Sequence, residues 1–131
     1  MIVLDASALL DVLLENDRAP DVTGYLSNVS VPLVAPDHML VETTRTLRRL
    51  ALANMISDES ADTQVLNALG LGVRTYPSRD LLPRAWTMRS SITIDDALYV
   101  ALAESIDGSR LLTTDRKLAK AASGRVDVIA L

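Results

Sequence analysis

The sequence contains no cysteine, no phenylalanine and a single histidine. Without thiols the chain can form neither disulfides nor thiolate metal sites, and one imidazole is too few for a conventional zinc centre. Aromatic residues are also scarce, with one Trp and three Tyr. Because stacking on bases needs aromatic faces, any recognition of a nucleic acid is expected to depend mainly on its backbone and shape.

Long apolar runs and phosphate-binding glycine motifs are missing too. The first segment, MIVLDASALLDVLLEND, has no basic leader and places acids inside its apolar stretch. We therefore expect neither a signal peptide nor a membrane span, and a cytoplasmic protein. Neither GxxxxGKS/T nor GxGxxG occurs. Hydrophobic residues make up 49% of the 131 positions, which predicts one domain, residues 1–131, with a substantial core.

The chain is acidic, with a net charge of −4 from 13 basic and 17 acidic residues. This balance argues at first against a nucleic-acid partner. If four of the acids bind metal, however, the remaining acids and bases are equal in number. Arginine supplies 11 of the 13 bases, and its guanidinium suits bidentate contacts with phosphates.

Short apolar segments alternate with segments of helical length along the whole chain. The first kind is typical of strands buried on both faces, and the second of helices with an apolar stripe. We expect strands at 2–5, 31–36, 73–77, 110–114 and 126–131, and helices at 6–14, 20–26, 37–54 (capped by Asp37), 57–70, 79–90, 95–106 and 115–122. This order predicts an α/β fold, a three-layer α/β/α sandwich around a short, mostly parallel sheet.

Four acidic residues stand at the edges of these apolar segments: Asp5, Glu42, Asp96 and Asp115. Two follow predicted strands, and two lie near the start of predicted helices. Because the carboxyl ends of parallel strands lie on one side of a sheet, the topology permits all four to meet there. Clustered carboxylates repel one another unless a cation binds, and Mg²⁺ and Mn²⁺ prefer oxygen ligands. The pattern therefore indicates metal-assisted hydrolysis of a phosphodiester.

Each acid also has a purely structural interpretation. Asp5 and Asp115 are placed to cap the helices that follow them. Asp96 is placed to complete a capping box with Thr93. Glu42 has arginines three and seven residues further along its helix, at spacings that allow ion pairs. Either interpretation holds for one acid alone, but four such placements at one sheet edge favour a shared site.

At these residues the chain resembles the PIN-domain nucleases, and specifically the VapC-type toxins of bacterial toxin–antitoxin pairs. The resemblance rests on four segments in order: IVLDASALLDVLL, VETTRTLRRL, DDALYVALAES and LLTTDRKLAKAA. It implies that Asp5, Glu42, Asp96 and Asp115 bind Mg²⁺ or Mn²⁺. It further implies endonucleolytic cleavage of structured RNA, of the tRNA or rRNA class, by metal-activated water that leaves 3′-hydroxyl and 5′-phosphate ends.

The resemblance also assigns supporting positions and leaves one ambiguity. Ser7 and Thr113 fall where the family keeps small hydroxyl residues near the metal, and would orient a ligand or a water. Directly before Asp96, where the family commonly has an aromatic or apolar residue, this chain has Asp95. Asp96 matches the family better because Ala97 follows it. Asp95 is then an N-cap, an outer-shell ligand or a substitute ligand.

A VapC-type toxin implies a cognate VapB-type antitoxin that covers the metal site, an RNA substrate and a homodimer, with no membrane partner. Arg45, Arg49 and Arg116 lie near the acids in sequence or along a helix face. We expect one or more of them to contact the RNA or the antitoxin, the alternative being a solvated surface. The apolar stretches 9–14 and 47–52 are candidates for either protein interface, although such stretches more often belong to a core.

Two other functions are compatible with the pattern, and a third fits it poorly. A PIN-fold nuclease of RNA processing would lack an antitoxin, and an RNA-binding PIN module would lack catalysis. A phospho-acceptor receiver also keeps acids at strand ends, but it needs an acidic pair where this chain has only Asp5 followed by Ala-Ser. It also needs a lysine after a late strand, whereas Lys117 and Lys120 fall in a predicted helix.

Overall fold

The computed structural model describes all 131 residues, which form five strands and seven helices. The strands are β1 (Ile2–Leu4), β2 (Leu33–Pro36), β3 (Arg74–Tyr76), β4 (Arg110–Thr113) and β5 (Asp127–Ala130). The helices are α1 (Ala6–Leu13), α2 (Ala19–Ser27), α3 (His38–Leu52), α4 (Asp58–Gly70), α5 (Ser78–Trp86), α6 (Ile94–Ser105) and α7 (Arg116–Ala122). Every expected element is present. The largest difference is at α5, because residues 87–91 continue as tight turns instead of α-helix.

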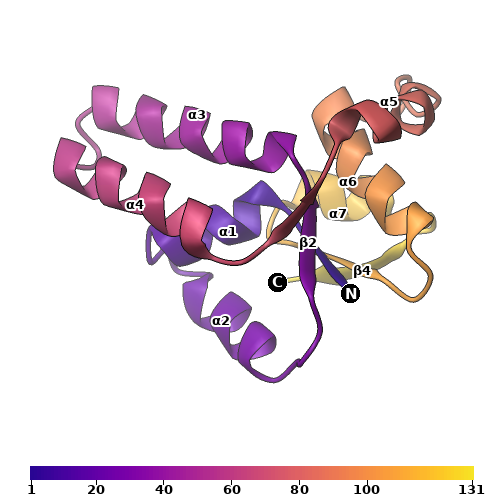
Figure 1. The fold of residues 1–131 in the computed structure, drawn as a ribbon, viewed down its shortest axis with the longest axis horizontal. Helices are drawn as coiled ribbons and strands as arrows, with labels where there is room; N and C mark the ends of the chain where they lie inside the picture. The colour runs from indigo at the N-terminus through magenta and orange to yellow at the C-terminus, as the bar shows by residue number, and fades with distance from the viewer.

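The strands lie in the order β3-β2-β1-β4-β5, and every neighbouring pair is parallel. The chain therefore moves outward from β1 to β3 and then returns to the other side of β1 for β4 and β5. Because parallel crossovers are right-handed, this reversal puts α1–α4 on one face of the sheet and α5–α7 on the other (Figure 1). The predicted three-layer sandwich is confirmed, and its sheet is parallel throughout.

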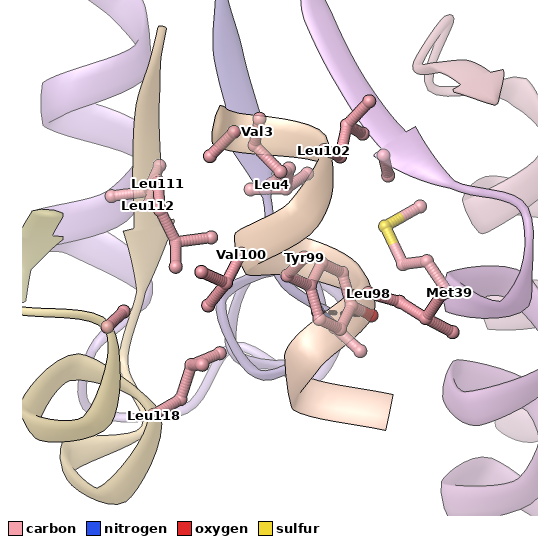
Figure 2. Close-up of a cluster of buried hydrophobic side chains, with 14 of the residues drawn as sticks. Val3, Leu4, Met39, Leu98, Tyr99, Val100, Leu102, Leu111, Leu112 and Leu118 are labelled. Atoms are coloured by element: carbon pink, nitrogen blue, oxygen red, sulfur yellow. Dashed lines mark hydrogen bonds between the residues drawn. The ribbon is translucent and has the colours of Figure 1, made fainter. Parts of the chain in front are cut away.

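Helix α6 forms the centre of the core. Its residues Ala97–Ala103 are all buried, with at most 5% of any residue exposed. A helix that is apolar on every side needs cover all round, and α6 has it, since it packs on β1, β2 and β4 and against α5. Figure 2 shows its side chains between Val3 and Leu111 of the sheet, Met39 of α3 and Leu118 of α7.

The sequence predicts that Asp37 caps α3, but the structure shows that it does not. Its backbone is already helical, and its side chain makes no bond to the first amides of α3. Its carboxylate instead accepts hydrogen bonds from the hydroxyl of Ser78 and, at 2.9 Å, from the Ser78 amide at the start of α5. These bonds hold the pKa of Asp37 below its ordinary value. The carboxylate thus stabilises a helix that begins 41 residues further along the chain.

Helices α3 and α4 extend beyond the sheet on one side of the molecule (Figure 1). We call these two helices and the turn between them the arm. Leu47 of the arm is buried, but several of its large apolar residues are exposed: Val41, Leu52, Met55, Leu66 and Leu69. The stretches 9–14 and 47–52 are thus partly core, with Leu9 buried and Leu52 exposed. No helix of the protein combines the length and apolar character that crossing a membrane requires.

Truncation of Leu111 in β4 is expected to reduce stability strongly, because the side chain is fully buried at the centre of the sheet. Leu111→Ala should lower the free energy of unfolding by about 2–5 kcal/mol, measured by urea denaturation. Leu66→Ala is the matched control, because Leu66 is 69% exposed, and it should change stability by less than about 0.5 kcal/mol. Equal losses for the two variants would contradict this description of the core.

Candidate functional site

The strand order reverses between β1 and β4, and the carboxyl ends of these two strands meet at one edge of the sheet. Crevices at such reversals are the usual binding positions of open parallel sheets. Asp5 follows β1 directly, and its amide donates to the carbonyl of Leu112 in β4 at 3.1 Å. Asp115 follows β4 by one turn residue. Two of the four acids are therefore brought together by strand pairing alone.

The Asp5 carboxylate is buried, with only 3% of the residue exposed. Its Oδ2 accepts hydrogen bonds from the hydroxyl of Thr113, at 2.7 Å, and from the hydroxyl of Ser7. Each hydroxyl also accepts a backbone amide: Ser7 that of Thr114 at 3.2 Å, and Thr113 that of Asp115 at 3.0 Å. Asp5 makes no side-chain cap bond to α1. The capping interpretation of Asp5 is therefore wrong, and its orientation comes from the two hydroxyls.

Glu42 is held by a tyrosine from the opposite layer. The hydroxyl of Tyr99 donates to Glu42 Oε2 at 2.8 Å and accepts the amide of Ala6 at 3.3 Å. The His38 ring packs against Tyr99 with 4.9 Å between ring centroids, and its Nε2 lies 3.6 Å from Glu42 Oε2. Burial lowers the pKa of His38, so the imidazole is neutral at neutral pH. No arginine pairs with Glu42, and the expected ion pairs on its helix are absent.

Asp115 has the cap contacts that its position suggested, whereas Asp96 has only half of its capping box. Asp115 Oδ1 accepts the amides of Lys117 and Leu118, at 2.7 and 3.3 Å, at the start of α7. The hydroxyl of Thr93 accepts the amide of Asp96 at 3.2 Å at the start of α6. A cap bond uses only one carboxylate oxygen, or none in the case of Asp96. It therefore does not prevent either acid from also binding an ion.

The adjacent acids at the start of α6 face different neighbours. Asp96 is half-buried, and the charges of Asp5 and Asp115 raise its pKa. Asp95 is exposed, and its charge raises the pKa of Glu42, as the charge of Asp96 also does. The difference follows from helix geometry, in which successive side chains point about 100° apart. Asp96 thus lies near Asp5 and Asp115, the two acids that follow strands.

Burial is the largest cause of the raised pKa values of Asp5, Glu42 and Asp96. The charges of neighbouring acids raise them further: Glu42 and Asp115 act on Asp5, and Asp96 acts on Glu42. Repulsion of this kind requires that the carboxylates lie near one another. As the side chains stand, however, no three acids or histidines converge on one point at metal-ligand distance.

The donor set nevertheless suits a hard divalent cation. Asp5, Glu42 and Asp115 each direct one oxygen to protein donors, and the second oxygen of each accepts no hydrogen bond from the protein. The site therefore offers several free carboxylate oxygens among partly buried, mutually repelling charges. Oxygen ligands without sulfur or imidazole favour Mg²⁺ or Mn²⁺ over zinc.

The three arginines singled out in the sequence are all exposed, and none forms an ion pair. Arg45 lies close enough to Glu42 for its charge to lower the pKa of that carboxyl. Arg116 opens α7 directly after Asp115. Arg49, one helical turn beyond Arg45, lies further along α3.

Comparison with known proteins adds a family to this geometry. The family model described as "PIN domain" matches residues 2–124. This chain belongs to the PIN-domain family. Two curated relatives from Mycobacterium tuberculosis are Ribonuclease VapC12, 38% identical over 120 residues, and Ribonuclease VapC3, 35% identical over 121 residues. The alignments cover 92% of this PIN domain in both cases, and 91% and 86% of the two relatives.

The fold is shared with solved structures as well. The crystal structure of Mycobacterium tuberculosis VapC20, described as a sarcin–ricin loop cleaving toxin, superposes with a TM-score of 0.74. The superposition covers 97% of this PIN domain and 99% of that chain, at 18% identity. At this identity the likeness supports the fold alone. The predicted membership among VapC-type PIN domains is confirmed by the curated relatives.

The sequence did not reveal the contact between Tyr99 and Glu42 or that between Thr114 and Asp11. In the sequence, 57 residues separate Tyr99 from Glu42. The Thr114 hydroxyl donates to Asp11 Oδ2 at 2.6 Å across 103 residues. Such contacts depend on strand order, for which the sequence carries no local signal.

Removal of the Asp5 charge is expected to stabilise the metal-free protein. Since its folded pKa is raised, the ionised carboxylate costs stability, and this cost grows as pH rises from the ordinary value of 3.8 to the raised pKa. Asp5→Asn cannot ionise but keeps an oxygen to accept from Ser7 and Thr113. In EDTA it should melt about 2–4 °C higher than the unmodified protein at pH 7.

The pH series is the control for this prediction. The advantage of Asp5→Asn should shrink as the pH falls through the raised pKa of Asp5 toward its ordinary value of 3.8, because the unmodified carboxyl then takes up a proton as well. A variant that melts lower at every pH would show that the hydroxyl contacts to a carboxylate outweigh the repulsion.

Tyr99→Phe is expected to destabilise the protein, because it leaves the buried Ala6 amide and Glu42 without their partner. The loss should be about 1–3 kcal/mol in the free energy of unfolding. Tyr25→Phe is the matched control, since the Tyr25 hydroxyl is buried without a partner, and its removal should be neutral or stabilising. Equal effects in urea denaturation would contradict a role for the Tyr99 hydroxyl.

Proposed function

We propose that this PIN domain is a Mg²⁺- or Mn²⁺-dependent endoribonuclease that acts as the toxin of a toxin–antitoxin pair. Its substrate is structured RNA of the tRNA or rRNA class. The observation that carries the proposal is the group of partly buried acids at the strand reversal. The similarity to VapC ribonucleases along nearly the whole chain supports the same activity.

Asp5, Glu42, Asp96 and Asp115 would hold the ion, through the oxygens that make no bond to the protein. When bound, such an ion activates a water for attack on the phosphodiester and neutralises charge on the phosphate oxygens. Asp95 is exposed beside this group and would contribute in the outer shell. The oxygen-only donor set and the mutual repulsion of the acids support this assignment.

The surrounding residues keep the carboxylates in place. Ser7 and Thr113 fix one oxygen of Asp5 and so determine where the other oxygen points. Tyr99 does the same for Glu42. Fixed outer partners of this kind commonly contribute a factor of about 10–100 to metal affinity or activity.

The partners proposed for this protein are a VapB-type antitoxin and a second copy of the chain. The exposed apolar residues on α3, on α4 and in the turn between them, among them Leu52, Met55 and Leu66, support a protein interface on that arm. The exposed cations Arg45, Arg49 and Arg116 support contacts with RNA phosphates or with acids of the antitoxin.

The proposed activity is tested by incubating the purified, antitoxin-free protein with total cellular RNA in Mg²⁺, Mn²⁺ or EDTA. We expect discrete fragments with 5′-phosphate ends in either metal and none in EDTA. The cleavage rate should fall by about 100-fold or more in each of the variants Asp5→Asn, Glu42→Gln, Asp96→Asn and Asp115→Asn. Loss of a direct metal ligand should lower activity at least as much as loss of a residue that only hydrogen-bonds to a ligand.

Asp62→Asn is the charge-matched control, since Asp62 is exposed on α4, and it should cleave like the unmodified protein. Asp95→Asn separates the adjacent acids and should lose less activity than Asp96→Asn. A folded protein that binds RNA but yields no metal-dependent fragments would support the alternative of an RNA-binding PIN module. Cleavage by a protein whose gene has no short reading frame for a DNA-binding antitoxin directly upstream would instead favour a nuclease of RNA processing.

A further inference from the structure

A cleft of about 440 Å³ opens next to the acidic group, between the turns that precede α6 and the first turns of α7. This volume is within the usual range for sites that bind a small molecule or one unit of a polymer. Its polar lining consists of Arg89, Ser90, Ser91, Thr93, Asp96 and Lys117. Asp96 belongs both to this cleft and to the acidic group, so a ligand in the cleft lies directly beside the proposed reaction centre.

The charges of the cleft favour an anion. Arg89 and Lys117 are exposed, come from different elements, and form no ion pair with any acid of the protein. The three hydroxyl residues of the lining add donors that suit phosphate oxygens. Asp96 is the only acid in the lining, beside the two cations.

An aromatic plane lies against Arg89, one of the two cations that line the cleft. Trp86, the only tryptophan of the chain, is 59% exposed although it is large and apolar. The Arg89 guanidinium lies over its ring, 4.6 Å from the centroid, and Arg89 Nη1 donates to the Trp86 carbonyl at 3.0 Å. The hydrogen bond and the cation–π contact together fix the guanidinium beside the cleft. Indole and guanidinium planes are both surfaces on which unpaired bases stack.

We propose that this cleft binds the single-stranded nucleotide next to the bond that is cut, a role that rests on the proposed function. Its phosphate lies at Arg89 and Lys117, and its base stacks on the Trp86–Arg89 pair. The scarcity of aromatic residues predicts recognition mainly by backbone and shape. The structure places the single tryptophan where it adds a stacking contact beside the acids.

The single tryptophan provides a direct measurement, because all of the indole emission comes from Trp86. A single-stranded RNA of about ten nucleotides is titrated into the protein in EDTA, so that binding is observed without cleavage. We expect saturable quenching of the emission. Arg89→Ala should weaken binding about tenfold and reduce the slope of log affinity against log salt by about 0.7.

The other variants are followed by the anisotropy of labelled RNA. Trp86→Ala should weaken binding about tenfold, and Trp86→Phe should restore most of it, because the phenyl ring still stacks. Arg18→Ala removes one exposed cation directly before α2, away from the cleft, and should bind within about twofold of the unmodified protein. Trp86 and Arg89 are exposed, so circular dichroism melts of these variants should match the unmodified protein.

Cleavage of total cellular RNA by the same variants separates this proposal from the proposed function. If the unmodified protein cleaves RNA with metal but Arg89→Ala and Trp86→Ala bind RNA as it does, the cleft proposal is overturned and the nuclease stands. If RNA quenches Trp86 in an Arg89-dependent way but nothing is cleaved, the cleft proposal stands and the nuclease fails. If RNA neither quenches Trp86 nor is cleaved, both are overturned.

Discussion

Strands β1 and β4 lie side by side at the centre of the sheet, although about 108 residues separate Asp5 from Thr113. Their pairing places Leu4 beside Leu112 in the core and the residues that follow them at the sheet edge. The same register therefore builds the apolar centre and the polar site. A slip of one residue would turn the side chains to opposite faces and separate Asp5 from Thr113.

The acidic site lowers the stability of the metal-free protein, and the rest of the fold offsets this loss. Burial and neighbouring charges raise the pKa values of three carboxyls, so the ionised group opposes folding of the metal-free chain. The fully buried side chains of α6 and the central strands offset this cost. A group that costs stability and is still held in place by dedicated hydroxyls is more consistent with a functional role than with a structural one.

The two layers of helices contribute differently to the site. Tyr99 reaches from α6 to Glu42 of α3 and to the amide of Ala6, and so connects elements from both faces of the sheet. Helix α5 ends at Trp86, and the turns after it add Arg89, whose guanidinium lies over the Trp86 ring and lines the cleft. Asp5 and Glu42 thus lie where buried or part-buried contacts fix their positions, while the cations and the indole are exposed and lie where a ligand can reach them.

The sequence by itself determined the positions of the helices and strands, the parallel α/β class and the four acids at segment edges. These features are local, because the periodicity of apolar residues records how each segment is buried. Only the tertiary structure decided that Asp37 serves α5, that Asp5 is held by Ser7 and Thr113, and that Asp95 and Asp96 face different neighbours. These contacts join residues far apart in the chain or depend on the rotation of a helix. They follow from the order in which the strands assemble, which no local pattern encodes.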